Sequence, residues 1–276
     1  MVSTLSLAGM VFSLLLSFLF PLILAIIFIR KYKTGILPFV TGAGIFIFFA
    51  LILEQLIHLL VLGAKSPIAE TIKASPFLLG MYGGFAAGIF EETGRLIAFL
   101  FILRKTRDWS HGVVYGIGHG GIEAWILLSW TYVNNLVISL MVNGGQLDTI
   151  KSALTPVQIK AIDQGVQTLI STDSSLFFIA GIERVLTVII HIGLSLLVLL
   201  AVRNRKYYYF VLAILLHAAL NFTAVYMNMK LNNIVLTEII VAAFAAVSVL
   251  WIIRSKALMT PPVPAPETTI TEEPET

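Results

Sequence analysis

The 276-residue sequence contains no cysteine and few charged residues, which make up only 12% of the chain. The absence of cysteine excludes disulfides, a thiol nucleophile, iron–sulfur clusters and cysteine-ligated zinc. Soluble domains carry about 25% charged residues, so the scarcity of charge argues against a soluble fold. Apolar residues take the place of the missing charge: 58% of the chain is hydrophobic and the mean hydropathy is +0.94.

The apolar residues are concentrated in stretches of about twenty residues or more, each long enough to cross a hydrocarbon core of about 30 Å. Because lipid cannot satisfy backbone N–H and C=O groups, each stretch is expected to be a helix. The sequence therefore predicts an all-α, polytopic transmembrane bundle in the cell membrane. The seven predicted spans cover residues 5–29, 36–62, 77–103, 111–133 (with an extension to 142 left open), 176–201, 207–228 and 233–253.

The remaining segments predict one membrane domain, residues 1–256, followed by a cytoplasmic tail at 257–276. The end of the chain is rich in Pro, Thr and Glu and has almost nothing to bury, so we expect the tail to be disordered. Between the fourth and fifth spans, residues 143–175 are more polar. A short helix near 156–170 is expected there, lying on the membrane surface.

Lys and Arg are distributed unequally between the two alternating sets of loops. Basic residues are more frequent in cytoplasmic loops, so the set with more of them predicts an outer N-terminus and a cytoplasmic C-terminus. This set contains eleven: Arg30, Lys31, Lys33, Arg104, Lys105, Arg107, Arg203, Arg205, Lys206, Arg254 and Lys256. The opposite set contains five: Lys65, Lys73, Lys151, Lys160 and Lys230. The net charge of +3 thus comes from short clusters at span ends, which indicates a bilayer and not nucleic acid as the partner.

Polar residues inside the spans are the functional candidates, because ionisable groups are costly in a membrane. Three histidines have a polar partner four residues later, on the same helix face: His119 with Glu123, His191 with Ser195, and His217 with Asn221. The third span adds Glu91, Glu92 and Arg95, and the fifth adds Glu183 and Arg184. These residues define the candidate site.

Depth in the membrane provides an independent criterion. Counted from the cytoplasmic end of each span at about 1.5 Å per residue, Glu91, His119, His191 and His217 lie about 12–18 Å deep. Glu54 and His58 in the second span lie deeper, and we interpret that pair as structural. The shared depth predicts that the other four residues converge on one site.

Imidazoles with a carboxamide or carboxylate are typical zinc ligands, so the sequence predicts a zinc site. A nearby carboxylate can act as general base, which fits Glu91 or Glu92, with Glu91 favoured. Arg95 lies four residues after Glu91 and three after Glu92, where it can keep a carboxylate ionised or stabilise an oxyanion. The HExxH motif of ordinary zinc proteases is absent from the chain.

The motifs EETGR, GHGGIEA, GIER followed by a histidine, and HAALNF resemble the YhfC-type membrane peptidases. These belong to the superfamily of type II CaaX prenyl proteases, PrsW-type proteases and the non-proteolytic Aph subunit of gamma-secretase. The resemblance covers residues 77–228. It implies a peptide hydrolase acting on membrane-embedded or membrane-adjacent peptides or proteins. The implied catalytic residues are Glu91, Glu92 and Arg95, and the implied metal ligands are His119, His191, His217 and Asn221.

Two departures from the CaaX enzymes mean that prenylated substrates are not implied. The spacing between the glutamates and Arg95 is one residue shorter, and Tyr115 replaces the usual Phe. Two other interpretations stay open: a non-catalytic scaffold of the same superfamily, and a proton- or ion-coupled transporter, although no repeated half of the kind common in transporters is visible. The sequence does not define the oligomeric state. Its residue types favour zinc but do not identify the metal ion.

The charge distribution makes a testable prediction about topology. Reporters fused after Lys33, Arg107, Arg205 and Lys256 should all report the cytoplasm, and a reporter inserted near Gln158 should report the outside, because positive loops stay inside. A cytoplasmic signal from the Gln158 insertion would contradict both the span count and the argument from shared depth.

Overall fold

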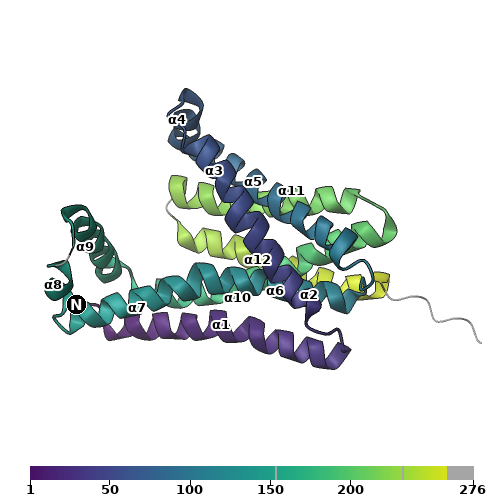
Figure 1. The fold of residues 1–276 in the computed structure, drawn as a ribbon, viewed down its shortest axis with the longest axis horizontal. Coiled ribbons are helices and arrows are strands. Elements are labelled where there is room, and N and C mark those ends of the chain that lie inside the picture. Colours follow the sequence, from purple (N-terminus) through teal and green to yellow (C-terminus); the bar gives the residue numbers. More distant parts are fainter. Residues whose placement is uncertain (153, 232, 260–276) are drawn as a thin grey trace, which may run out of the picture.

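The computed structural model describes residues 1–152, 154–231 and 233–259, and all regular elements in these ranges are helices (Figure 1). The predicted all-α class is confirmed. The helices are α1 (Thr4–Tyr32), α2 (Leu37–Phe46), α3 (Gln55–Leu62), α4 (Pro67–Ala74), α5 (Pro76–Ile97), α6 (Trp109–Ala124), α7 (Trp130–Asn143), α8 (Leu147–Lys151), α9 (Pro156–Ser171), α10 (Ser174–Asn204), α11 (Tyr208–Tyr226) and α12 (Ile234–Met259).

Four π-helical segments continue these helices without a break. They are η1 (Ile47–Glu54), which joins α2 to α3, η2 (Ala98–Ile102) after α5, η3 (Trp125–Ser129), which joins α6 to α7, and η4 (Met227–Leu231) after α11. Such segments shift the register of a helix and are frequent at functional sites.

Six helices in the described ranges are long and apolar enough to cross a membrane, and they correspond to six of the seven predicted spans. The expected span at 77–103 is also a helix, formed by α5 and η2. It is not among the six because Glu91, Glu92 and Arg95 interrupt its apolar character. The left-open extension of the fourth span is present, since this helix continues to Asn143.

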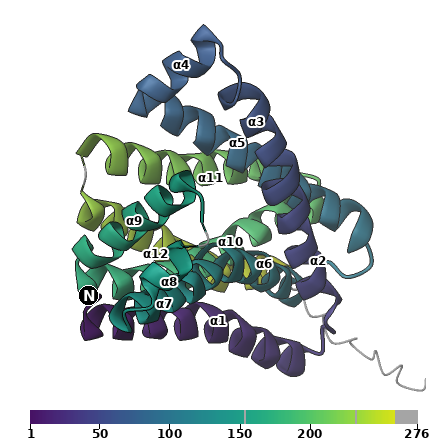
Figure 2. The ribbon, with the colours of Figure 1, turned by 60° about the vertical axis from the view of Figure 1, so that its left-hand side comes forward.

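Helix α10 lies at the centre of the bundle. It packs against α1, α6, α11 and α12 (Figures 1 and 2), and every residue from 190 to 202 is buried. A helix that is apolar and buried on all sides belongs to the core. Two further helix pairs pack along each other: α11 with α5, and α2 with α6.

Two glycines allow the helices around the centre to approach closely, as small residues do at helix contacts in membranes. A methyl group on Gly116 of α6 would lie 2.6 Å from Ile192 Cα of α10, and one on Gly88 of α5 would lie 2.7 Å from the Ile214 carbonyl oxygen of α11. Each glycine lies three residues from a predicted site residue, His119 and Glu91 respectively. Close backbone contact therefore brings the candidate residues of different helices together.

The predicted short helix in the 143–175 segment is present as α9, which begins with a capping box between Thr155 and Gln158. Its Val166 and Leu169 are buried in the protein, and α9 contacts α7. Part of its apolar face is thus covered by the bundle. At the C-terminus, α12 continues to Met259, beyond the predicted start of the tail at 257, and residues 260–276 lie outside the described ranges.

The close contact at Gly116 predicts a loss of stability on a small substitution. Gly116→Ala should lower the free energy of unfolding by about 1–3 kcal/mol, the typical cost of overpacking, because the methyl group would meet backbone of α10. The matched control is Gly83→Ala on α5, where nothing lies within 4 Å of the added methyl group. Thermal unfolding of both variants in detergent tests this, and equal midpoints would contradict the packing.

Candidate metal centre

The centre begins with three charged residues on one face of α5. Helix α5 starts at Ser75, whose side chain accepts a hydrogen bond from the Leu78 N–H, with Pro76 in the first turn. More than about five turns later, Arg95 is fully buried and its Nη1 donates to Glu92 Oε1. Its Nη2 lies 3.6 Å from Glu91 Oε2. Both contacts follow from the i+3 and i+4 spacing of a helix.

His119 joins the centre from α6 and is fully buried. Its Nε2 lies 2.7 Å from Glu91 Oε2 and donates to that carboxylate. Its Nδ1 has no hydrogen-bond partner within the described residues. A buried imidazole nitrogen without a partner is costly, and it carries the lone pair that a metal ion would require.

His191 joins from α10 and is held by two oppositely charged groups. Arg95 Nη2 lies 2.6 Å from His191 Nδ1, and because a guanidinium only donates, Nδ1 accepts. His191 Nε2 lies 2.5 Å from Glu123 Oε2 of α6. The ring is therefore held between α5 and α6 with its proton on Nε2, and its one lone pair, on Nδ1, would bind a metal ion only in place of the Arg95 contact.

His217 joins from α11, with its Nδ1 2.7 Å from Glu92 Oε1. The opposite nitrogen, Nε2, faces Glu91 Oε1 at 3.8 Å, which is beyond hydrogen-bond distance. A carboxylate on one nitrogen and a free lone pair on the other is the usual arrangement of a metal-ligating histidine. Asn221 lines the same cavity as His191 and His217, one turn further along α11.

The structure thus brings together the four residues for which the sequence predicts a shared depth. The ring centroids of His119 and His191 are 5.0 Å apart, and those of His191 and His217 are 5.5 Å apart. Ligand atoms of Glu91, His119 and His191 all lie within 4.8 Å of one another. This buried set of imidazole and carboxylate donors fits a zinc-type ion. The roles assigned to the individual residues stay predictions.

Glu123, Glu183 and Arg184 form a second group beside the centre. Arg184 Nη1 donates to Glu123 Oε1 at 3.1 Å, and Nη2 donates to Glu183. Glu123 therefore links His191 to Arg184 and ties α6 to α10. Helix spacing places Glu123 on the same face as His119 but cannot identify its partners on other helices. The sequence therefore leaves the role of Glu123 open.

The Glu54–His58 pair is also present, with Glu54 Oε1 3.2 Å from His58 Nε2. His58 Nδ1 lies 3.0 Å from the Tyr82 hydroxyl of α5. Glu54 is buried, and η1, which ends at this residue, packs against α5. The pair therefore lies beside α5, the helix that carries Glu91, Glu92 and Arg95.

Taken together, the helices and their contacts define a polytopic membrane protein with a buried carboxylate–histidine centre that is able to hold a metal ion. Residues 16–241 match the family described as YhfC intramembrane metalloprotease. The Bacillus subtilis (strain 168) protein named "Uncharacterized membrane protein YhfC" is 36% identical over 248 residues, which cover 87% of this chain and 93% of that protein. The chain belongs to the YhfC family, and the predicted resemblance is confirmed. No solved structure matches the chain.

The donor set predicts which histidine variants lose metal. His119→Ala should weaken zinc binding by at least about 10–100-fold, the loss already caused by removing groups that only orient a ligand. His58→Ala is the matched control, because this histidine contacts Glu54 and Tyr82 on the border of the centre. Metal content and zinc affinity of both purified variants, after size-exclusion chromatography confirms the fold, measure the difference. Equal zinc affinity in the two variants would remove His119 from the ligand set.

Proposed function

We propose that the protein is an intramembrane, metal-dependent endopeptidase that hydrolyses peptide bonds of membrane-embedded or membrane-adjacent substrates. In this proposal His119, His191 and His217, together with Asn221, hold a zinc ion. Glu91 is the general base, and Glu92 and Arg95 complete the catalytic group. The proposal extends the metalloprotease description of the family to named residues of this chain.

The observation that carries the proposal is the position of the Glu91 carboxylate between the histidines. One of its oxygens contacts His119, and the other faces the free nitrogen of His217. Glu91 is also one of the most buried carboxylates of the chain, with 8% of its side chain exposed. A carboxylate beside the ligands can take a proton from the attacking water and give it to the leaving amine.

Glu92 and Arg95 are expected to have a different role from Glu91. Glu92 contacts both Arg95 and His217 Nδ1, so it orients the imidazole and leaves its Nε2 free. Arg95 holds Glu92 and His191 at the same time. Its Nη2 also lies 3.6 Å from the carboxylate of Glu91, so a positive charge faces the proposed base.

When bound, the zinc ion would supply Lewis acidity, which polarises a substrate carbonyl and makes water more acidic. The protein residues provide the rest: they exclude lipid, orient the ligands and move the proton. A transporter or a non-catalytic scaffold would show no cleavage. The proposal therefore depends on demonstrating both metal and hydrolysis.

The paired glutamates make the proposal testable. Glu91→Gln should keep the fold and most of the metal but lower cleavage by more than about 100-fold, since general bases contribute about 10²–10⁴-fold. Glutamine preserves the shape and hydrogen bonding of the side chain and removes its basicity. The readout is the set of new protein termini in membranes of cells that express wild type or variant protein, followed by cleavage of the identified substrate in vitro.

Glu92→Gln is the matched control on the neighbouring position. It should weaken metal binding through His217, because the carboxylate that orients this ring is changed. Full cleavage by Glu91→Gln combined with loss in Glu92→Gln would reverse the two roles. Full activity of both variants would disprove the carboxylate mechanism.

A further inference from the structure

The cavity at the candidate centre extends in one direction only. Its volume is about 130 Å³, and Glu91, His191, His217 and Asn221 line one part of it. The remaining polar lining comes from Glu123, Glu183, Arg184 and Thr187. On α6 and α10, these residues lie on the side of His119 and His191 that leads toward α7 and toward the start of α10. The end of the bundle in this direction carries the N-terminus, α8 and α9 (Figures 1 and 2).

Exposure increases along this direction. The exposed fraction of the side chain is 0% for His119, 8% for Glu91, 13% for Glu123, 16% for Arg184 and 29% for Glu183. Arg184 and its two carboxylate partners therefore lie between the centre and the more exposed end of the bundle. Charged residues at membrane depth line water-filled or protein-filled spaces.

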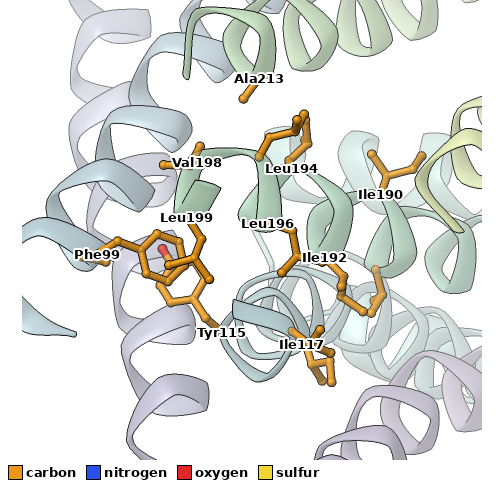
Figure 3. Close-up of a cluster of buried hydrophobic side chains, with 14 of the residues drawn as sticks. Phe99, Tyr115, Ile117, Ile190, Ile192, Leu194, Leu196, Val198, Leu199 and Ala213 are labelled. Atoms are coloured by element: carbon orange, nitrogen blue, oxygen red, sulfur yellow. The ribbon is translucent and has the colours of Figure 1, made fainter. Parts of the chain in front are cut away.

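The opposite direction is closed by packed side chains. One helical turn from the candidate residues on the same helix faces lie Tyr115, Ser195 and Ala213, and Phe99 follows Arg95 in the same way. All four have exposed fractions of 0%. Figure 3 shows Phe99, Tyr115 and Ala213 in the hydrophobic cluster that also contains Leu196 and Leu199. This cluster separates the centre from the ends of the helices that carry the Lys and Arg clusters.

We propose that water and substrate reach the centre from the extracytoplasmic side, through the passage lined by Glu123, Glu183, Arg184 and Thr187. The side is assigned by the Lys and Arg distribution, which places the closed end in the cytoplasm. The substrate is then a peptide segment exposed in the outer half of the membrane or at its outer surface. This inference rests on the proposed function for the nature of the substrate, and on the cavity and packing for the route.

The lining of the passage also indicates the chemistry of the segment that enters. The carboxylate, guanidinium and hydroxyl groups of the passage can hydrogen-bond the backbone of an extended peptide, which cannot remain unsatisfied in lipid. An acyl or prenyl chain offers no such groups, and burying these polar side chains against it would be unfavourable. The passage therefore suits a peptide and not a lipid tail.

The absence of cysteine from the chain permits a direct test by single cysteine substitutions, each labelled with a small, charged, membrane-impermeant methanethiosulfonate. Thr187→Cys and Ser195→Cys form a matched pair, since each lies four residues from His191 on α10, one on each side. Ala224→Cys in the passage and Ala213→Cys in the closed cluster form a second pair on α11. Gln158→Cys on α9 and Lys105→Cys after η2 mark the two membrane faces.

With reagent applied outside intact cells, Thr187→Cys and Ala224→Cys should react at least about tenfold faster than Ser195→Cys and Ala213→Cys, because thiol reactivity requires access to solvent. Gln158→Cys should react from outside and Lys105→Cys only in inside-out vesicles. The proposed passage would be overturned if Ser195→Cys or Ala213→Cys reacted faster than the passage variants. It would also be overturned if none of the four variants reacted with the reagent. Labelling of Gln158→Cys only from the cytoplasmic side would overturn the assignment of the passage to the extracytoplasmic side. None of these readouts depends on hydrolysis, so the passage and the proposed activity can fail separately.

Discussion

The centre depends on the pairing of one buried positive charge. Arg95 is fully buried, and a buried charge without partners is strongly unfavourable. Its guanidinium contacts Glu92 on its own helix and His191 on α10, and Glu92 in turn contacts His217 on α11. Removing one partner of a buried ion pair typically costs about 3–5 kcal/mol. The positions of α5, α10 and α11 are therefore coupled through Arg95, and the rest of the centre is built on this arrangement.

Each histidine of the centre has its own carboxylate. Glu91 contacts His119, Glu92 contacts His217, and Glu123 contacts His191. Such pairs fix the orientation and tautomer of an imidazole, so protein groups orient all three rings. Arg95 and Arg184 compensate the excess of negative charge. A membrane interior tolerates this number of charges because nearly every one of them contacts another.

The sequence predicts the helices and the residues that meet, because hydropathy and depth are properties of single helices. It does not predict which side chains contact each other across helices. Arg95 and His191, for example, are 96 residues apart, and their contact depends on how α5 packs against α10. Glu54 shows another limit. Counting residues gives its depth but not its neighbours, and in the structure its segment η1 packs against α5.

A hydrolytic centre inside a membrane requires water at one end and protection from lipid elsewhere. Helix α10 meets both requirements with its two halves. From residue 190 to 202 all of its residues are buried, which keeps water away from His191 on that half. Before residue 190 its polar residues Glu183, Arg184 and Thr187 are only partly buried and line the cavity. Because the same helix supplies both the seal and the passage, His191 lies at the boundary between them, where a peptide from the open side would meet the centre.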